Sequence, residues 1–281
     1  MPRVRVNLLG EGSLRIDGVE IAVPRVMTGI VGYLLLQPKY TASRDRLASA
    51  LWPASTDAAA RHALANAIYR VRAALPAPCA IVAMAGDRCV LDRSFTGGID
   101  LVFLERRLDR LFARQEATPR AWRRRLGRML GDAGGTLFAG IDEEWAAFAR
   151  ERWRCRRLDA LVLLADLAAR EGDWGQAVAL GRDVCAAEPL REDAQRLLID
   201  ALARSGNRAL ALRQYRLCAQ VLRDELDVTP MAETRALAAR LRDDGVAAPR
   251  TPSRLREALI ATRAQLRTAL DHVESALATN R

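Results

Sequence analysis

The sequence predicts a mainly α-helical protein with a small β part, in which an N-terminal α+β domain precedes an all-helical domain and a C-terminal helix. Three patterns carry this prediction. Apolar and polar residues alternate in residues 3–23 and 80–92, as in half-buried strands. Apolar residues recur at helical spacing through most of the remaining chain. A short motif near residue 170 returns roughly 34 residues later, which is the period of tetratricopeptide helix pairs.

The composition narrows the class of protein. Of the 281 residues, 50% are hydrophobic and 28% are charged, which is typical of a globular chain of about two domains. No apolar run approaches the roughly 18 residues of a membrane span, and the N-terminal segment has too short an apolar core for a signal peptide. The five Cys form no CxxC pair, which predicts a reduced, cytoplasmic protein.

The same composition gives no reason to expect a metal, a cofactor or catalysis. Only two His are present, His62 and His272, and they lie far apart in the sequence. A His-rich metal site or a His-based triad is therefore not expected. Lys39 follows no Gly-rich loop, so no phosphate-binding loop is predicted either. We expect a binding protein rather than an enzyme.

Charge is the strongest remaining signal. The chain holds 44 basic and 34 acidic residues, for a net charge of +10, and a basic chain without a membrane segment typically binds a polyanion. Residues 1–98 hold 12 basic and 7 acidic residues, residues 99–157 hold 14 and 9, and residues 158–244 hold 12 and 15. The polyanion is therefore expected to meet the first half of the chain.

Two β regions frame the N-terminal domain. In residues 3–23, short apolar runs are separated by Glu11-Gly12-Ser13 and by Asp17-Gly18, which are hairpin signals that predict a small antiparallel sheet. Residues 80–92 predict two further strands about a turn at Gly86-Asp87.

Three helices are predicted between these β regions. The first covers residues 26–36, the second covers 44–52 with Ser43 as its cap, and the third covers 57–75 with Asp57 as its cap. A sheet, three helices and a hairpin in this order predict a winged helix-turn-helix domain.

The chain after the Gly97-Gly98 pair, which we interpret as a linker, is predicted to be helical. Residues 170–180 superpose on residues 204–214, so that Gly172 matches Gly206 and Ala177 matches Ala211. This spacing predicts paired helices of the tetratricopeptide type, with helices before them that cap the repeats. Those earlier helices are expected at residues 99–114, 119–131 and 142–156.

A second linker is predicted at residues 245–252, followed by a helix over 253–279. Leu255, Leu266 and Leu277 lie on its apolar stripe, which predicts packing against a second copy or against the repeats. The predicted domains are a winged helix-turn-helix domain (1–98), a tetratricopeptide-like domain (99–244), and a linker with a C-terminal helix (245–281).

Long stretches of the chain resemble one family in the family's own order. They include RVMTGIVGYLLLQPKYTASRDRLASALWP, ARHALANAIYRVRAAL, LFAGIDEEWAAFARERW and AAEPLREDAQRLLIDALARSGNRALALRQYRLCAQVLRDELDVTPMAETRAL. Over about residues 3–242 the chain is similar to the SARP-type (AfsR-like) bacterial transcriptional regulators. This resemblance implies an OmpR-type winged helix-turn-helix followed by a bacterial transcriptional activation domain. It also implies two protomers on direct repeats of double-stranded DNA, together with RNA polymerase holoenzyme.

The third predicted helix carries the candidate DNA-binding residues. With Ala60, Leu64, Ala67, Ile68 and Val71 inward, its outer face carries Arg61, His62, Asn66, Tyr69, Arg70 and Arg72. The resemblance places Asn66 and Arg70 at base-reading positions, and His62, Tyr69 and Arg72 at backbone-contact positions. Arg88 on the wing is a further candidate. The alternative is an ordinary solvated helix face.

Other conspicuous residues have a structural interpretation. Trp52 and Trp174 are expected in apolar packing. Two arginine clusters are expected to pair with Glu143, Glu144 and Glu151, although they could instead extend a DNA footprint. Cys79 and Cys89 lie at the outer ends of the predicted hairpin and could approach each other. The arginine clusters are Arg123, Arg124, Arg125 and Arg128, and Arg154, Arg156 and Arg157.

These observations predict a sequence-specific DNA-binding transcriptional regulator that acts as an activator, as a homodimer, in the bacterial cytoplasm at the nucleoid. Two alternatives remain open. One is a repeat-type scaffold whose winged helix contacts only protein. The other is a sensor that binds a small molecule on the concave helical surface and thereby controls DNA binding.

Overall fold

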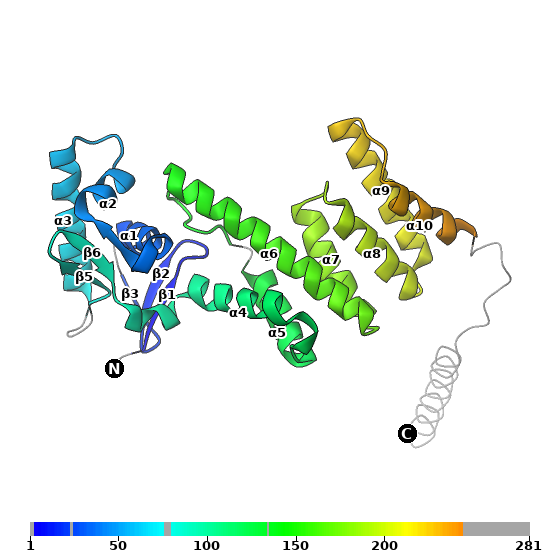
Figure 1. Cartoon of the computed structure of the whole chain (residues 1–281), viewed down its shortest axis with the longest axis horizontal. Coiled ribbons are helices and arrows are strands. Elements are labelled where there is room, and N and C mark those ends of the chain that lie inside the picture. The colour runs from blue at the N-terminus through cyan, green and yellow to red at the C-terminus, as the bar shows by residue number, and fades with distance from the viewer. Residues whose placement is uncertain (1–2, 23–24, 76–79, 134, 244–281) are drawn as a thin grey trace, which may run out of the picture. The chain divides into compact units, whose positions relative to one another are not determined.

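The computed structural model describes residues 3–22, 25–75, 80–133 and 135–243. The chain divides into two units, Met1–Thr234 and Arg235–Arg281. Helix α10 (Ala232–Asp243) begins in the first unit and supplies the described part of the second. The predicted linker at 245–252 and the predicted helix at 253–279 lie outside the described residues. The first unit therefore contains the other described helices and all the described strands, which Figure 1 labels.

Two three-stranded antiparallel sheets form the β part. The first contains β1 (Val4–Asn7), β2 (Ser13–Ile16) and β3 (Val19–Ile21) in that order. The second has the order β4-β6-β5, in which the predicted hairpin of β5 (Val82–Ala85) and β6 (Arg88–Leu91) pairs with β4 (Thr41–Ser43). The sequence did not predict β4, because three residues directly before a helix cap carry no alternation signal of their own.

The three predicted helices of the N-terminal domain are confirmed as α1 (Val26–Leu36), α2 (Arg44–Leu51) and α3 (Asp57–Ala74). The Ser43 side chain caps α2 by accepting a hydrogen bond from the Arg46 N–H at 3.3 Å. The expected cap of α3 was wrong by one residue. Thr56 accepts the bond from the Ala59 N–H, whereas Asp57 is already the first helical residue, where its charge suits the helix dipole.

The second half is helical, as predicted, with one correction. The helix expected over 142–156 is α6 (Glu144–Arg170), which continues 14 residues further because no Gly or Pro interrupts it. The 3-10 segments are η1 (Pro38–Tyr40), η2 (Arg93–Gly98) and η3 (Gln115–Ala117). The other helices are α4 (Asp100–Arg114), α5 (Arg120–Asp132), α7 (Trp174–Ala187), α8 (Glu192–Arg204) and α9 (Arg208–Leu226).

Helices α6 to α9 form the predicted repeat, each packed on the next in sequence. Gly172 and Gly206 lie at the turns after α6 and α8 with φ of 74° and 87°, a conformation that a side chain would strain. Ala177 lies in a cluster of small, fully buried side chains, and half-buried Trp174 packs against that cluster. Trp52 is likewise half-buried rather than fully enclosed.

The Gly97-Gly98 pair does not act as a free linker in this fold. Both glycines belong to η2, and a side chain at Gly98 would collide with the Val4 carbonyl oxygen. Directly afterwards the Asp100 carboxylate accepts hydrogen bonds from the N–H groups of Leu8 (2.9 Å) and Leu9 (3.1 Å). The start of α4 is therefore fixed to the end of β1.

A second connection joins the first sheet and α1 to the helices of the second half of the chain. The Phe138 N–H donates to the Leu8 carbonyl oxygen at 3.0 Å, and its fully buried ring lies against Gly32 in α1. The Trp145 ring meets the rings of Tyr33 and Phe138 at 5.4 Å each, and its Nε1–H donates to the Ala50 carbonyl oxygen at 3.1 Å. The two halves of this unit therefore share one core.

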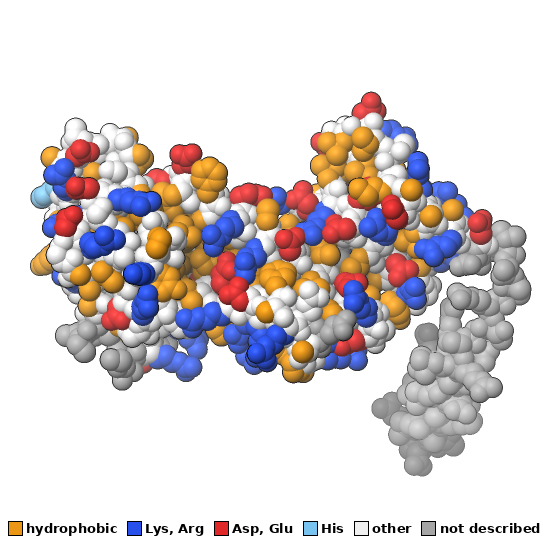
Figure 2. All heavy atoms as spheres, viewed as in Figure 1, with side chains coloured by type: hydrophobic (Ala, Val, Ile, Leu, Met, Phe, Trp, Pro, Cys, Tyr) orange, Lys and Arg blue, Asp and Glu red, His pale blue; other side chains and the backbone are white. Residues whose placement is uncertain are grey.

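Basic and acidic side chains are interspersed over the face shown in Figure 2. Large apolar side chains are also exposed, and many of them belong to α9 and the residues after it. Among the described residues, no helix is long and apolar enough to cross a membrane. The exposed apolar residues of this region are Leu210, Leu217, Leu226, Val228 and Met231.

The contact between Gly32 and Phe138 gives a stability test. A Cβ at Gly32 would lie 2.5 Å from Phe138 Cε1, so Gly32→Ala should lower the free energy of unfolding by about 1–3 kcal/mol. Gly175→Ala is the matched control, because it is also helical but meets nothing within 4 Å, and it should stabilise by up to about 1 kcal/mol. Urea unfolding of each variant measures the difference. Equal stability of Gly32→Ala and Gly175→Ala would contradict the shared core.

Candidate nucleic-acid interface

Helix α3 has the predicted inner face. Leu64 is fully buried, and the other four apolar residues at the same helical spacing are each at least nine-tenths buried. Helix α2 precedes α3 and makes the most extensive packing contact of this domain with it. This is the arrangement of a helix-turn-helix, in which the second helix leaves one long side open. The buried set is Ala60, Leu64, Ala67, Ile68 and Val71.

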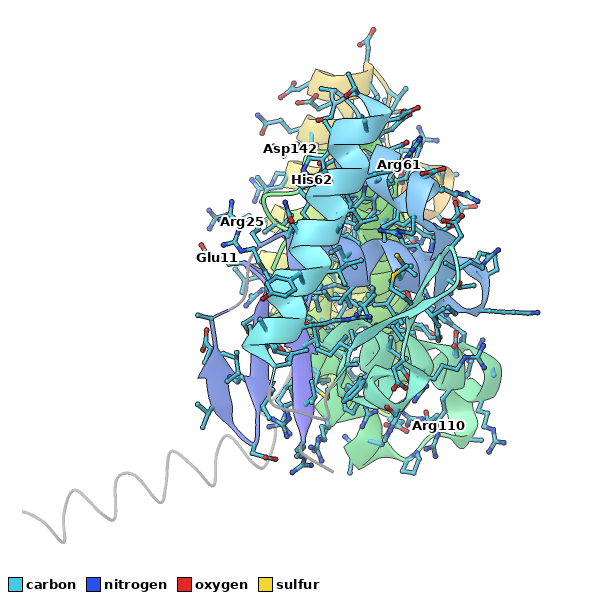
Figure 3. All side chains as sticks on the ribbon, turned by 90° about the vertical axis from the view of Figure 1, so that its left-hand side faces the viewer. Glu11, Arg25, Arg61, His62, Arg110 and Asp142 are labelled. Carbon is cyan, nitrogen blue, oxygen red and sulfur yellow. The ribbon has the colours of Figure 1, made fainter. Side chains whose placement is uncertain are left out.

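All six candidates on α3 are exposed, and 73% of the Tyr69 surface is accessible. In Figure 3, which looks onto α3, His62 and Arg61 project from different sides of the helix. At about 100° per residue, His62, Asn66 and Tyr69 form one stripe opposite the buried face. The structure therefore brings these three side chains together at the centre of the exposed surface.

The three arginines of α3 separate onto two flanks of this stripe. Arg70 lies beside Asn66, whereas Arg72 is rotated from Arg70 by roughly 160° and shares the other flank with Arg61. Both residues on that second flank have protein contacts: Arg61 pairs with Asp45 of α2 at 2.8 Å, and Arg72 donates a long 3.5 Å hydrogen bond to the Val82 carbonyl oxygen. Arg70 has no ion pair or hydrogen bond among the described residues.

The wing candidate lies on the second sheet. Arg88 is exposed at the start of β6, and its Nε–H donates to the Thr41 hydroxyl oxygen at 3.3 Å. The strand register places Arg88 opposite Ser43, next to Arg44. The sequence analysis did not consider Arg44, because it treated this segment only as the start of a helix.

Part of the arginine clusters is structural. Arg123 is buried and pairs with Glu171, and Arg124 pairs with Asp173. Burial raises the pKa of Asp173, but hydrogen bonds from Arg124 and Arg120 outweigh it and hold this pKa below its ordinary value. Arg123 and Arg124 therefore form ion pairs, as predicted, but with Glu171 and Asp173 in place of the expected Glu143, Glu144 and Glu151.

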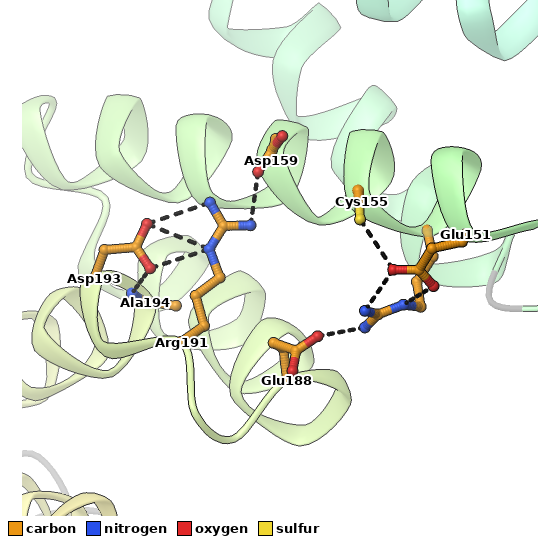
Figure 4. Close-up of polar contacts among 8 residues, drawn as sticks. Glu151, Cys155, Asp159, Glu188, Arg191, Asp193 and Ala194 are labelled. Carbon is orange, nitrogen blue, oxygen red and sulfur yellow. Dashed lines mark hydrogen bonds and ion pairs between the residues drawn. The ribbon is translucent and has the colours of Figure 1, made fainter. Parts of the chain in front are cut away.

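Arg154 and Arg156 also have ion pairs, mostly with unexpected partners. Figure 4 shows the surroundings of Glu151 and Glu188. Arg154 pairs with Glu151, as predicted, and with Glu188. Its hydrogen bonds, followed by one from Cys155, lower the pKa of Glu151 to about 2. Arg156 pairs with Glu105 and Asp109 of α4. No ion pair with Glu143 or Glu144 is found among the described residues, because these two carboxylates lie at the start of α6, away from the clusters.

The described residues hold no group of three or more His, Cys, Asp or Glu side chains that could bind a metal. Burial raises the pKa of Cys185 to about 12 and that of Cys218 to about 11. Cys89 is buried too. Cys79 lies outside the described residues, so the expected approach of Cys79 to Cys89 stays a prediction. The four described thiols all have raised pKa values, the opposite of an activated nucleophile.

A pocket of about 550 Å³ lies between β1 and the start of α4. It is lined by Arg3, Arg5, Asn7, Asp100 and Phe103, among others. This is not the concave helical surface on which the sensor alternative placed a ligand, and the Asp100 carboxylate there already accepts backbone hydrogen bonds.

Comparison with known proteins agrees with this architecture. Residues 99–242, just over half of the chain, match the family described as bacterial transcriptional activator domain. The regulatory protein AfsR of Streptomyces coelicolor is 30% identical over 243 residues, which are 85% of this chain and 24% of AfsR. AfsR of Streptomyces griseus is 29% identical over 209 residues, which are 74% of this chain and 21% of that protein. The chain thus spans about a quarter or less of the length of these relatives.

A solved structure shares the fold. The structure of Mycobacterium tuberculosis EmbR in complex with a low-affinity phosphopeptide matches with a TM-score of 0.69 at 21% identity, over 96% of this chain and 72% of that chain. The chain belongs to the bacterial transcriptional activator domain family. The predicted resemblance to SARP-type regulators is confirmed.

The thiol environments predict an order of chemical modification. Cys155 is exposed, although its hydrogen bond to Glu151 raises its pKa, whereas Cys89, Cys185 and Cys218 are buried. In a Cys79→Ser background, iodoacetamide should therefore alkylate Cys155 about tenfold or more faster than the other three. Peptide mapping by mass spectrometry gives the rates. Alkylation of Cys185 in the folded protein at the rate of Cys155 would contradict the buried position of Cys185 in α7.

Proposed function

We propose that this chain is a transcriptional activator that binds double-stranded DNA in a sequence-specific manner through α3. The observation that carries the proposal is the long exposed side of α3, which presents His62, Asn66, Tyr69 and Arg70 opposite a fully packed core. Membership of the bacterial transcriptional activator domain family supports it.

The proposed mechanism is binding, without a catalytic step. The second helix of a helix-turn-helix enters the major groove, where every base pair presents a distinct pattern of donors and acceptors. Asn66 and Arg70 lie four residues apart, so they read neighbouring bases, Asn at adenine and Arg at guanine. His62, Tyr69, Arg72 and the wing residue Arg88 contact the phosphate backbone, and Arg61 is oriented by Asp45.

The wider organisation belongs to the same proposal. The winged helix-turn-helix of residues 1–98 binds DNA, the helical domain of 99–244 engages RNA polymerase holoenzyme and a second protomer, and the segment 245–281 strengthens that association. Such a protein works in the cytoplasm at the nucleoid and needs no cofactor. The resemblance to SARP-type regulators supports these assignments. Equal affinity for random and selected DNA would instead favour the scaffold alternative.

The arginines of α3 provide the test. After selection of a preferred duplex from a random pool, Arg70→Ala should weaken binding to it by about 1–3 kcal/mol and flatten discrimination at one base position. Arg72→Ala should weaken all duplexes about equally and lower the salt slope by about one phosphate contact. Titration of each variant on selected and scrambled duplexes at several salt concentrations separates the two effects.

Arg182→Ala is the matched control, because this arginine of α7 is also exposed and lies outside α3. It should leave both duplexes unaffected. A loss for Arg70→Ala that is the same on both duplexes would assign Arg70 to the phosphate contacts and leave Asn66 as the base reader. No preference for any selected duplex would contradict the proposed function.

A further inference from the structure

One side of α4 and α5 carries arginines that lie on aromatic rings. The Arg107 guanidinium carbon lies 3.5 Å from the centre of the Phe103 ring, and that of Arg110 lies 5.3 Å from the centre of the Trp122 ring. Both rings are half-buried. Stacking of this kind fixes the orientation of the guanidinium plane. We call Phe103, Arg107, Arg110, Trp122 and Arg125 the basic–aromatic surface.

The arginines of this surface lack the ion pairs that their sequence neighbours have. Among the described residues, no carboxylate pairs with Arg107, Arg110 or Arg125, whereas Arg123 and Arg124 are both paired. Burial, and then the charges of Arg125 and Arg110, lower the pKa of Arg107. Three cations, of which Arg110 and Arg125 act on Arg107, therefore lie near one another with no ion-pair partner among the described residues.

The end of α9 carries negative charge and exposed apolar side chains. Leu226, Val228 and Met231 are exposed by 55%, 46% and 60%, and three carboxylates accompany them within the same short segment. These carboxylates have no ion pair among the described residues, and they lie at a helix C-terminus, where the dipole disfavours negative charge. We call Asp224, Glu225, Leu226, Asp227, Val228 and Met231 the acidic–apolar surface.

The two surfaces lie at opposite ends of the helical array. Helix α5 packs on α6 and α7, whereas α9 packs on α8, and Figure 1 shows α5 and α9 on different sides of that array. Within the unit Met1–Thr234, one copy therefore does not bring its own two surfaces together.

We propose that the acidic–apolar surface of one copy docks on the basic–aromatic surface of a second copy, so that protomers associate head to tail. Charge and apolarity both match: three carboxylates face three arginines, and exposed Leu, Val and Met side chains face half-buried aromatic rings. Arg, Trp, Phe and Met are the residues enriched in the cores of protein interfaces. A phosphate backbone would match the arginines but leave the apolar side chains of α9 uncovered.

This inference rests on the self-association included in the proposed function and names its surfaces. Because the two surfaces differ, the contact is heterologous, and a third copy can add to a pair in the same way. The contact does not involve α3, so DNA reading and self-association are separable.

Charge reversal in the full-length chain tests the proposal. One variant carries Arg110→Glu with Arg125→Glu, and the other carries Asp224→Arg with Glu225→Arg. Each alone should weaken self-association by about tenfold or more, measured by sedimentation velocity over a range of concentrations. An equimolar mixture of the two variants should restore association, because each then meets a complementary charge. Arg182→Glu with Arg213→Glu is the control, because both arginines are exposed and lie outside the two surfaces.

Several outcomes overturn the proposal: a monomeric wild-type chain at all concentrations, unchanged association of either reversed variant, or no recovery in the mixture. Loss of affinity for a short duplex by the Arg110→Glu, Arg125→Glu variant, with unchanged association, would assign the surface to DNA. The duplex is chosen to hold one protomer. Failure of the wild type to bind it contradicts the proposed function, whereas normal binding with no association contradicts only this inference.

Discussion

The packing of the Phe138 ring against Gly32 is the constraint on which the arrangement of the first unit depends. Phe138 has φ of +54°, a conformation that costs a residue with a Cβ on the order of 1–3 kcal/mol. The surroundings hold it there: its N–H bonds to Leu8, and the Arg150 guanidinium donates to its carbonyl oxygen at 3.2 Å and to that of Ile141 at 2.8 Å. Complete burial of a phenyl ring offsets the strain. A ring can reach this place only because residue 32 has no side chain.

This contact fixes α3 with respect to the array. Helix α1 packs on α2 and α3 on one side and on α6 on another, so its position is determined by both halves. Trp145 adds a second point of attachment, since it bonds to the end of α2 through the Ala50 carbonyl oxygen. The exposed side of α3 is thus carried by a core that includes residues of α6. For that reason, substitutions at Phe138 or Trp145 can alter the presentation of α3 without touching it.

Structural features that depend on local periodicity could be predicted from the sequence. Contacts between residues far apart in the chain could not. The inner face of α3 follows from the spacing of Leu64 and its neighbours, and the turn glycines Gly172 and Gly206 follow from the repeat. The place of Phe138 has no such signal, because it depends on a glycine about a hundred residues earlier. The same limit explains why Gly97-Gly98 resembled a linker: the sequence does not show that Val4 occupies the space beside Gly98. Within the candidate site, spacing indicated which side chains of α3 are exposed, but not that Arg61 pairs with Asp45.

Ion pairs within the fold divide the arginines of this chain into paired and unpaired sets. Carboxylates of the acidic segment, from Asp159 to Glu188, pair with arginines of α5, α6 and the loop before α8. These pairs tie the helices of the array together at several points and remove positive charge from its middle. Arg70 of α3 and Arg110 of α4 are exposed and have no ion pair among the described residues, and the same holds for arginines elsewhere, such as Arg182 of α7 and Arg213 of α9. Because pairing within the fold cancels charge at some positions and not at others, the net charge of +10 does not by itself show where a polyanion or a partner would meet the molecule.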